Sequence, residues 1–218
     1  MSKHFLYILL LMLPFFVQSQ VVSDAKMWSS IGVKKKFNKL KLSLGVEHRL
    51  DENFSHTEKL FTELGAEYKI IKNLSGGFNY RFARESDYDD DNYLLNHRFD
   101  IGLEYQYKIK EFKLEYRVKY QTKTAPQHKN NPTYLRNKLT LIYKIENKKK
   151  DIRPYASYEF YYQFNNDRVI NRSRLTFGTK FDLSKKSSIK CFYTFENRFN
   201  TKNLRHNHIY GIGYSLDI

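Results

Sequence analysis

Three residues close together in the chain carry the functional groups of a hydrolase, namely a hydroxyl, an imidazole and a carboxylate. Ser55 and His56 stand beside Glu58, and these three groups are the parts of a nucleophilic hydrolase. Adjacent residues in an extended chain point apart, so this spacing does not assemble a triad. We therefore expect no catalytic residue and no enzymatic activity.

Two further groups offer metal ligands. Asp87 and the acidic run 89–91 supply the oxygen ligands of a hard cation, but without the spacing of a calcium loop, which favours a solvated acidic loop. His206 and His208 are two residues apart and share one face of a strand. Their aromatic neighbours favour a polar pair at a membrane interface. The sequence predicts neither a metal nor a cofactor.

The basic runs 34–36, 148–150 and 185–186, together with a net charge of +15, resemble those of a nucleic-acid binder. All three runs lie beside short predicted turns, where lysines can sit among anionic lipid head groups. The mean hydropathy of −0.68 is low, but it averages the two faces of every strand. We expect no nucleic-acid partner.

The chain that must position these groups alternates between apolar and polar residues. Within 95–109, Phe99 and Ile101 fall on one parity, whereas Arg98 and Asp100 fall on the other. Successive side chains of a strand point to opposite faces, so this alternation predicts strands. The predicted strands span 25–37, 40–51, 57–70, 74–85, 93–109, 112–123, 134–146, 152–164, 169–183, 188–199 and 204–218.

The predicted connections also alternate, between short turns such as 38–39 and 110–111 and longer loops such as 86–92 and 124–133. Outer-membrane barrels keep short turns in the periplasm and longer loops outside. The sequence predicts an all-β, antiparallel up-and-down transmembrane barrel of ten to twelve strands. Such barrels usually have an even number of strands, so the first segment is either an extra strand or one of twelve.

One parity is apolar and aromatic, and the other carries charges of both signs on nearly every strand. We assign the apolar face to lipid, because a charge there is costly, and the charged face to the lumen. A soluble lipocalin-like barrel would show the reverse. The predicted lumen charge network comprises Glu47, Arg49, Glu67, Arg81, Arg98, Asp100, Glu104, Glu115, Arg117, Arg136, Glu159, Arg174, Glu196 and Arg198.

The N-terminus has the features of a secretion signal. Lys3 precedes an apolar stretch at 5–17, and Ser19 is a small residue before a cut. We predict a cleaved signal peptide at 1–19 and a single barrel domain at 20–218, exported to the bacterial outer membrane. The single Cys191 excludes an internal disulfide.

Short Tyr, Glu and Arg patterns recur along the strands. They are Trp28, Glu47-His48-Arg49, Tyr80-Arg81, Asn96-His97-Arg98-Phe99, Glu115-Tyr116-Arg117, Leu135-Arg136, Tyr158-Glu159-Phe160, Arg174-Leu175 and Phe177-Gly178. With these patterns the chain resembles the domain of unknown function 2490 family of Gram-negative outer-membrane barrels. The resemblance implies a location and a fold, and it implies no activity.

The most favoured function is a non-enzymatic outer-membrane barrel with a structural role or a small, mostly occluded pore. Two alternatives stay open: a membrane-embedded lipid hydrolase or acyltransferase, and a surface-binding protein that acts through its outer loops. The expected partners are outer-membrane lipids and the barrel-assembly machinery. The latter would recognise the alternating C-terminal strand, which contains Tyr210, Ile212, Tyr214, Leu216 and Ile218.

Overall fold

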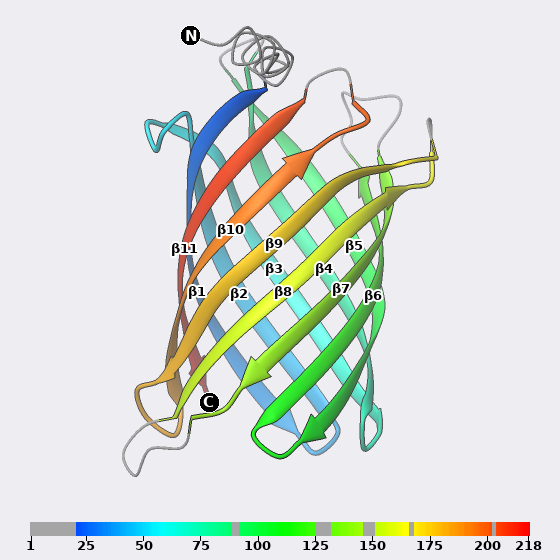
Figure 1. Ribbon diagram of the computed structural model, residues 1–218, viewed down its shortest axis with the longest axis vertical. Coiled ribbons are helices and arrows are strands. Elements are labelled where there is room, and N and C mark those ends of the chain that lie inside the picture. The colour runs from blue at the N-terminus through cyan, green and yellow to red at the C-terminus, as the bar shows by residue number, and fades with distance from the viewer. Residues whose placement is uncertain (1–20, 89–91, 125–131, 146–150, 166–167, 202–203) are drawn as a thin grey trace, which may run out of the picture.

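The protein is a single closed β-barrel (Figure 1). The computed structural model describes residues 21–88, 92–124, 132–145, 151–165, 168–201 and 204–218. The predicted signal peptide at 1–19 lies outside them, as does the acidic run 89–91. The strands are β1 (Val22–Phe37), β2 (Leu40–Asp51), β3 (His56–Ile71), β4 (Leu74–Asp87), β5 (Asn92–Ile109), β6 (Phe112–Thr124), β7 (Thr133–Tyr143), β8 (Ile152–Gln163), β9 (Ile170–Asp182), β10 (Ser187–Arg198) and β11 (Arg205–Asp217).

Closure of the ring corrects one part of the predicted topology. Consecutive strands pair antiparallel, as expected, but β1 and β11 close the ring in parallel, with Trp28 opposite Gly211. The described strands number eleven, and an odd number of alternating strands makes the first and last run in the same direction. The first predicted segment, 25–37, which did not fit an even-numbered ring, is therefore the additional strand β1 of the barrel wall.

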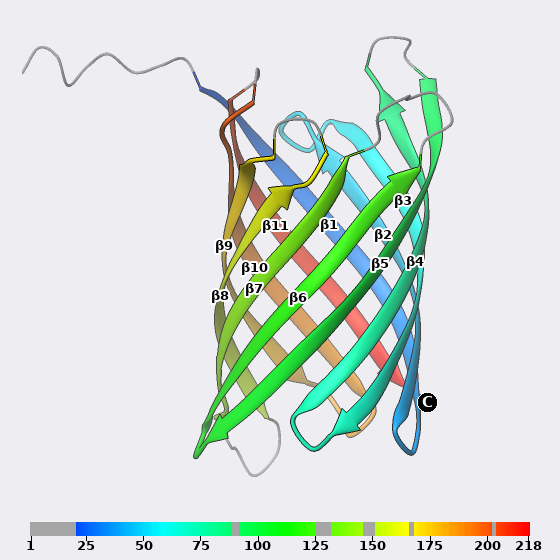
Figure 2. The ribbon, with the colours of Figure 1, turned by 90° about the vertical axis from the view of Figure 1, so that its right-hand side faces the viewer.

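The two ends of the barrel differ. One end, the turn end, has tight connections such as Asn38 to Lys39, where Asn38 has a positive φ of 50°. The other, the loop end, has the longer connections and the start of β1, whereas Ile218 closes the chain at the turn end (Figure 2). No helix among the described residues is long and apolar enough to cross a membrane.

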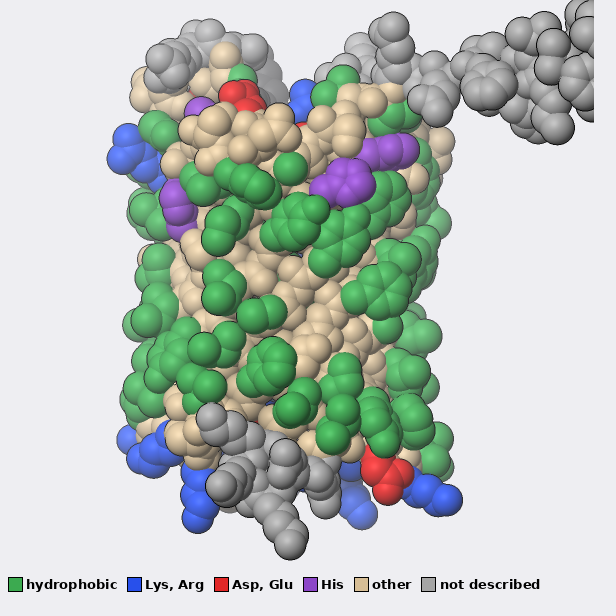
Figure 3. Space-filling model, turned by 60° about the vertical axis from the view of Figure 1, so that its left-hand side comes forward, with side chains coloured by type: hydrophobic (Ala, Val, Ile, Leu, Met, Phe, Trp, Pro, Cys, Tyr) green, Lys and Arg blue, Asp and Glu red, His purple; other side chains and the backbone are tan. Residues whose placement is uncertain are grey.

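Burial in this barrel is inverted relative to a soluble protein. Large apolar side chains such as Leu64, Ile101 and Phe177 are exposed. Figure 3 shows hydrophobic side chains spread over one side of the outer wall. Charged side chains such as Asp100 and Glu196 are almost fully buried. The sidedness assigned from parity is confirmed, and the lumen is polar and of mixed charge.

Aromatic rings also point into the lumen, in addition to the charged side chains that the sequence predicts there. Phe61, Tyr134 and Tyr161 are buried beside charged neighbours on the same strand face. Gly211 leaves space for the inward ring of Phe192, because a Cβ at Gly211 would lie 2.0 Å from the Cζ atom of that ring. The interior is filled by rings as well as by ion pairs.

Candidate functional site

The middle of the lumen is crossed by a buried ion-pair cluster around Glu159 of β8. Its Oε1 atom lies 2.9 Å from Nη2 of Arg136 and 3.3 Å from Nη2 of Arg117. Its Oε2 atom accepts a hydrogen bond of 3.1 Å from the Tyr161 hydroxyl. Glu159 is only 4% exposed. One carboxylate therefore joins strands β6, β7 and β8 across the interior.

A second cluster surrounds Glu196 of β10, which is 1% exposed. Arg174 approaches Oε2 at 2.6 Å, and Arg198 donates to Oε1 at 2.9 Å. Asn207 of β11 donates to the same Oε1 at 2.7 Å. Arg174 also contacts the Tyr161 hydroxyl at 2.5 Å, so the Glu196 and Glu159 clusters form one connected network.

A third cluster occupies β3, β4 and β5. Arg98 bridges Asp100 at 2.8 Å and Glu63 at 3.1 Å, and Arg81 contacts Glu63 at 2.7 Å. The Arg81 guanidinium also lies 3.4 Å from the centre of the Phe61 ring. This stacking compensates part of the cost of burying a cation. Glu63 was not among the predicted network residues, although its inward parity was visible in the sequence.

The remaining predicted network residues make more local contacts. Arg49 donates to Glu47 at 2.6 Å within β2 and stacks on Trp28. Glu104 accepts a hydrogen bond from Gln106 rather than from a cation. The other two pair with lysines near the turn end, namely Glu67 with Lys41 and Glu115 with Lys113. The structure thus divides the predicted set into the connected network of Glu159 and Glu196, the third cluster and peripheral pairs.

A cavity of about 360 Å³ lies in the loop-end half of the lumen, above this layer. Twelve Lys or Arg side chains but only four Glu side chains line it. Arg172 is one of the lining cations, and within the described part of the chain it has no carboxylate within salt-bridge distance, only the rings of Tyr134 and Tyr161. The cavity therefore favours anions.

A larger cavity of about 740 Å³ lies at the turn end. Lys138, Lys180 and Lys190 line it together with Glu115 and Arg117. Arg117 lines both this cavity and the loop-end cavity. Arg117 therefore lies at the boundary between the two cavities.

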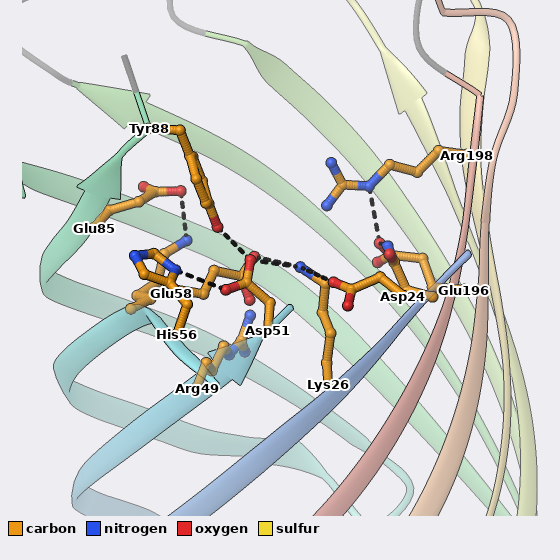
Figure 4. A network of polar contacts seen from close by, with 12 residues as sticks. Asp24, Lys26, Arg49, Asp51, His56, Glu58, Glu85, Tyr88, Glu196 and Arg198 are labelled. Atoms are coloured by element: carbon orange, nitrogen blue, oxygen red, sulfur yellow. Dashed lines mark hydrogen bonds and ion pairs between the residues drawn. The ribbon is translucent and has the colours of Figure 1, made fainter. Parts of the chain in front are cut away.

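At the loop-end rim, a polar cluster is centred on Asp51, the last residue of β2 (Figure 4). Asp51 is bonded by Lys26 at 3.3 Å, by Nδ1 of His56 at 2.9 Å and by the Tyr88 hydroxyl. Desolvation of its hydroxyl, and then the hydrogen bond to Asp51, raise the pKa of Tyr88 far above its usual value, although much of the side chain is exposed. The Tyr88 hydroxyl therefore stays protonated and donates a hydrogen bond to the Asp51 carboxylate.

The hydrolase-like residues of the sequence are rearranged by the fold. Ser55 does not reach His56, because its hydroxyl donates to the Glu52 carbonyl at 2.6 Å. Glu58 pairs instead with Lys26 at 3.1 Å. The hydroxyl that meets His56 belongs to Ser86 at the end of β4, which lies 3.1 Å from Nε2. Sequence spacing did not indicate this serine.

The two histidines that were weighed as metal ligands contact aromatic neighbours. His208 is hydrogen-bonded through Nδ1 to the Tyr193 hydroxyl at 2.7 Å, and His206 packs on Phe195. No group of three or more His, Cys, Asp or Glu side chains among the described residues is arranged to hold a metal ion.

Comparisons with known proteins agree with this architecture. A family model described as a protein of unknown function, DUF2490, matches residues 25–207. No curated protein matches the chain significantly. The β domain of the Bordetella autotransporter BrkA matches with a TM-score of 0.50 and 12% identity over 79% of this chain and 82% of that one. The likeness to this domain supports the fold of an outer-membrane barrel.

Two further solved structures are more distant. A bacterial polysaccharide outer-membrane secretin aligns with a TM-score of 0.44 and 8% identity, over 83% of this chain and 74% of its own. An anion-selective porin from Comamonas acidovorans aligns with a TM-score of 0.38 and 13% identity, over 81% of this chain and 52% of its own.

Proposed function

The chain belongs to the DUF2490 family of proteins of unknown function, and from that premise we propose an outer-membrane barrel with a structural role and a small, mostly occluded lumen. In this proposal the signal peptide at 1–19 is removed on export. The turn end faces the periplasm and the loop end faces outward, as in other barrels of this kind.

The buried ion-pair layer is the observation that supports occlusion. Glu159, Arg117 and Arg136 meet within 3.3 Å in the middle of the ring. Arg117 lines both cavities, so this cluster stands at the boundary between them, and inward side chains reduce the free space of a small barrel. Such a layer braces the wall and restricts any passage to small solutes.

Planar-bilayer recording of the full protein tests this proposal. We expect either no resolved steps or small ones, with a reversal potential in a KCl gradient that favours chloride, because cations predominate along the loop-end cavity. Heat-unfolded protein in the same detergent is the control. Large, steady, cation-selective steps would contradict the proposal.

If the outer wall faces lipid, the cost of placing an arginine on it should depend on the depth of the position in the membrane. Leu139 lies near the middle of β7 and is exposed, whereas Tyr143 is exposed at its turn end. Leu139→Arg is expected to cost about 2–4 kcal/mol in lipid, and Tyr143→Arg about 0–1 kcal/mol, because the cost depends on depth. Urea unfolding in phospholipid vesicles, followed by heat-modifiable gel migration, measures both. Equal costs would argue against a membrane-embedded wall.

Assembly is proposed to depend on β11. The apolar side chains of Tyr210, Ile212 and Tyr214 alternate along its outer face. This strand is the segment that we propose the barrel-assembly machinery recognises, and the lipid-facing side chains make outer-membrane lipids the other expected partner.

A further inference from the structure

Three side chains at the loop-end rim have the geometry of a serine hydrolase. The Ser86 hydroxyl lies 3.1 Å from Nε2 of His56, and Nδ1 of the same ring lies 2.9 Å from Oδ1 of Asp51. In such enzymes one imidazole nitrogen accepts the proton of the nucleophile while a carboxylate orients the other nitrogen. Both distances are within the range that this chemistry requires.

The carboxylate is held firmly in this position. Asp51 is buried, and its second oxygen, Oδ2, is bonded by Lys26 and by the Tyr88 hydroxyl. The ring of Tyr88 also packs against the His56 imidazole, with 5.1 Å between ring centres. These contacts keep Oδ1 directed at Nδ1, which fixes the tautomer that exposes Nε2 to Ser86.

The connection between the carboxylate and the imidazole is strained. Glu52, Asn53 and Phe54 have consecutive positive φ angles of 50°, 55° and 73°. Residues other than glycine seldom adopt this conformation, and such strain clusters at functional sites. Asn53 is held there by a hydrogen bond that its backbone N–H donates to Asp24. This conformation brings His56 back to the carboxylate of Asp51.

The site is accessible and bordered by apolar surface. The His56 side chain is 27% exposed. Phe54, Leu60 and Tyr88 are exposed apolar side chains within a few residues of the three groups. Acyl chains pack on such a surface, whereas a polar soluble substrate gains little from it.

We propose that Ser86, His56 and Asp51 hydrolyse acyl esters of membrane lipid at the loop end. This activity goes beyond the occluded barrel proposed above and differs from the non-enzymatic protein that the sequence predicts. Ser86 and His56 are the catalytic residues, and Asp51 is a positioning residue.

The reaction needs only water as a co-reactant. The Ser86 hydroxyl oxygen attacks the ester carbonyl carbon while His56 takes its proton, and the carbon–alkoxy bond breaks as His56 protonates the leaving alcohol. Water then gives a proton to His56 and attacks the acyl group. The acyl–Ser86 bond breaks, the proton returns to Ser86 and the fatty acid leaves.

The test uses the full protein, folded in vesicles of phosphatidylethanolamine and phosphatidylglycerol. A fluorophosphonate probe is expected to label Ser86, which mass spectrometry would locate, and fatty acid release from the vesicles is measured in parallel. A soluble short-chain para-nitrophenyl ester forms the second arm. Cleavage of this ester without cleavage of vesicle lipid would overturn the assignment of lipid as the substrate.

Substitutions separate catalysis from folding. Ser86→Ala is expected to abolish labelling, and His56→Ala to lower hydrolysis by about 10²–10⁴-fold, the contribution of a general base. Ser55→Ala is the matched control, because Ser55 lies next to His56 in the chain but its hydroxyl donates to the Glu52 carbonyl. Heat-modifiable migration shows whether each variant is folded. A folded wild type without labelling or hydrolysis, or a folded Ser86→Ala variant as active as the wild type, refutes the proposal.

The positioning role of Asp51 has its own readout. Asp51→Asn is expected to lower kcat with KM nearly unchanged, because the substituted amide disturbs the tautomer rather than substrate binding. Asp51→Glu restores part of kcat, since a carboxylate remains. Loss of heat-modifiability in parallel with activity, with no recovery by Asp51→Glu, would show that the residue only holds the rim together.

Discussion

Glu196→Gln is expected to lower the free energy of unfolding by about 3–5 kcal/mol, the cost of breaking a buried ion pair by removing one partner. Glu196 is 1% exposed and is bonded by Arg174 and Arg198. The amide has the same shape but no charge, so two partly buried guanidinium groups would lose this counter-charge. Urea titration of the folded barrel in vesicles, read from gel migration with and without heating, measures the change.

The matched control is Glu67→Gln, which removes a carboxylate of the same type from the same barrel. Glu67 pairs with Lys41 at 2.6 Å, but these side chains are 39% and 41% exposed. Solvent screens such a pair, which contributes only about 0–1 kcal/mol. Equal losses for the two variants would mean that the lumen around Glu196 is hydrated and that the ion-pair clusters do not brace the wall.

The strands and their faces could be predicted because the alternation that encodes them is local. β2 spans Leu40–Asp51, as predicted, and the other boundaries either match the predictions or differ from them by a few residues. The inward parity of Arg81 and Asp100 follows from the same pattern, since a one-residue shift would place both charges in lipid.

The ring closure and the rim site could not be predicted in this way. The parallel pairing of β1 with β11 depends on the total number of strands, which no single segment reveals. His56 and Ser86 are 30 residues apart in sequence and meet because β3 and β4 are neighbours in the ring. Sequence spacing drew attention to Ser55, whereas contacts between strands select Ser86.

Pairing across strands also decides which predicted charges act together. Glu159 was one of fourteen predicted network residues, and nothing in its own strand distinguishes it from Glu104. In the fold, Glu159 pairs with Arg117 and Arg136 from two preceding strands, whereas Gln106 is the only hydrogen-bond donor to the Glu104 side chain among the described residues. The ion-pair layer is therefore a property of register rather than of composition.

Simultaneous replacement of Arg117, Arg136 and Glu159 by alanine is expected to open the lumen. Arg117 lines both the loop-end cavity of about 360 Å³ and the turn-end cavity of about 740 Å³. Removal of the three long side chains would join these spaces. In planar bilayers we expect steady open steps where the unmodified protein gives none or small ones, with chloride still favoured by the remaining cations.

The design of this variant separates occlusion from stability. Deleting all three members of the cluster leaves none of them as a charge without its partner, so the barrel should remain folded where a single Glu159 substitution would leave two guanidinium groups without their carboxylate. The control replaces Glu159 by Gln and Arg117 and Arg136 by Met, which removes the charges but keeps most of the volume, since methionine fills irregular space. That control should stay closed. Open steps from both variants would show that charge pairing closes the lumen, whereas open steps from neither would place the constriction outside this layer.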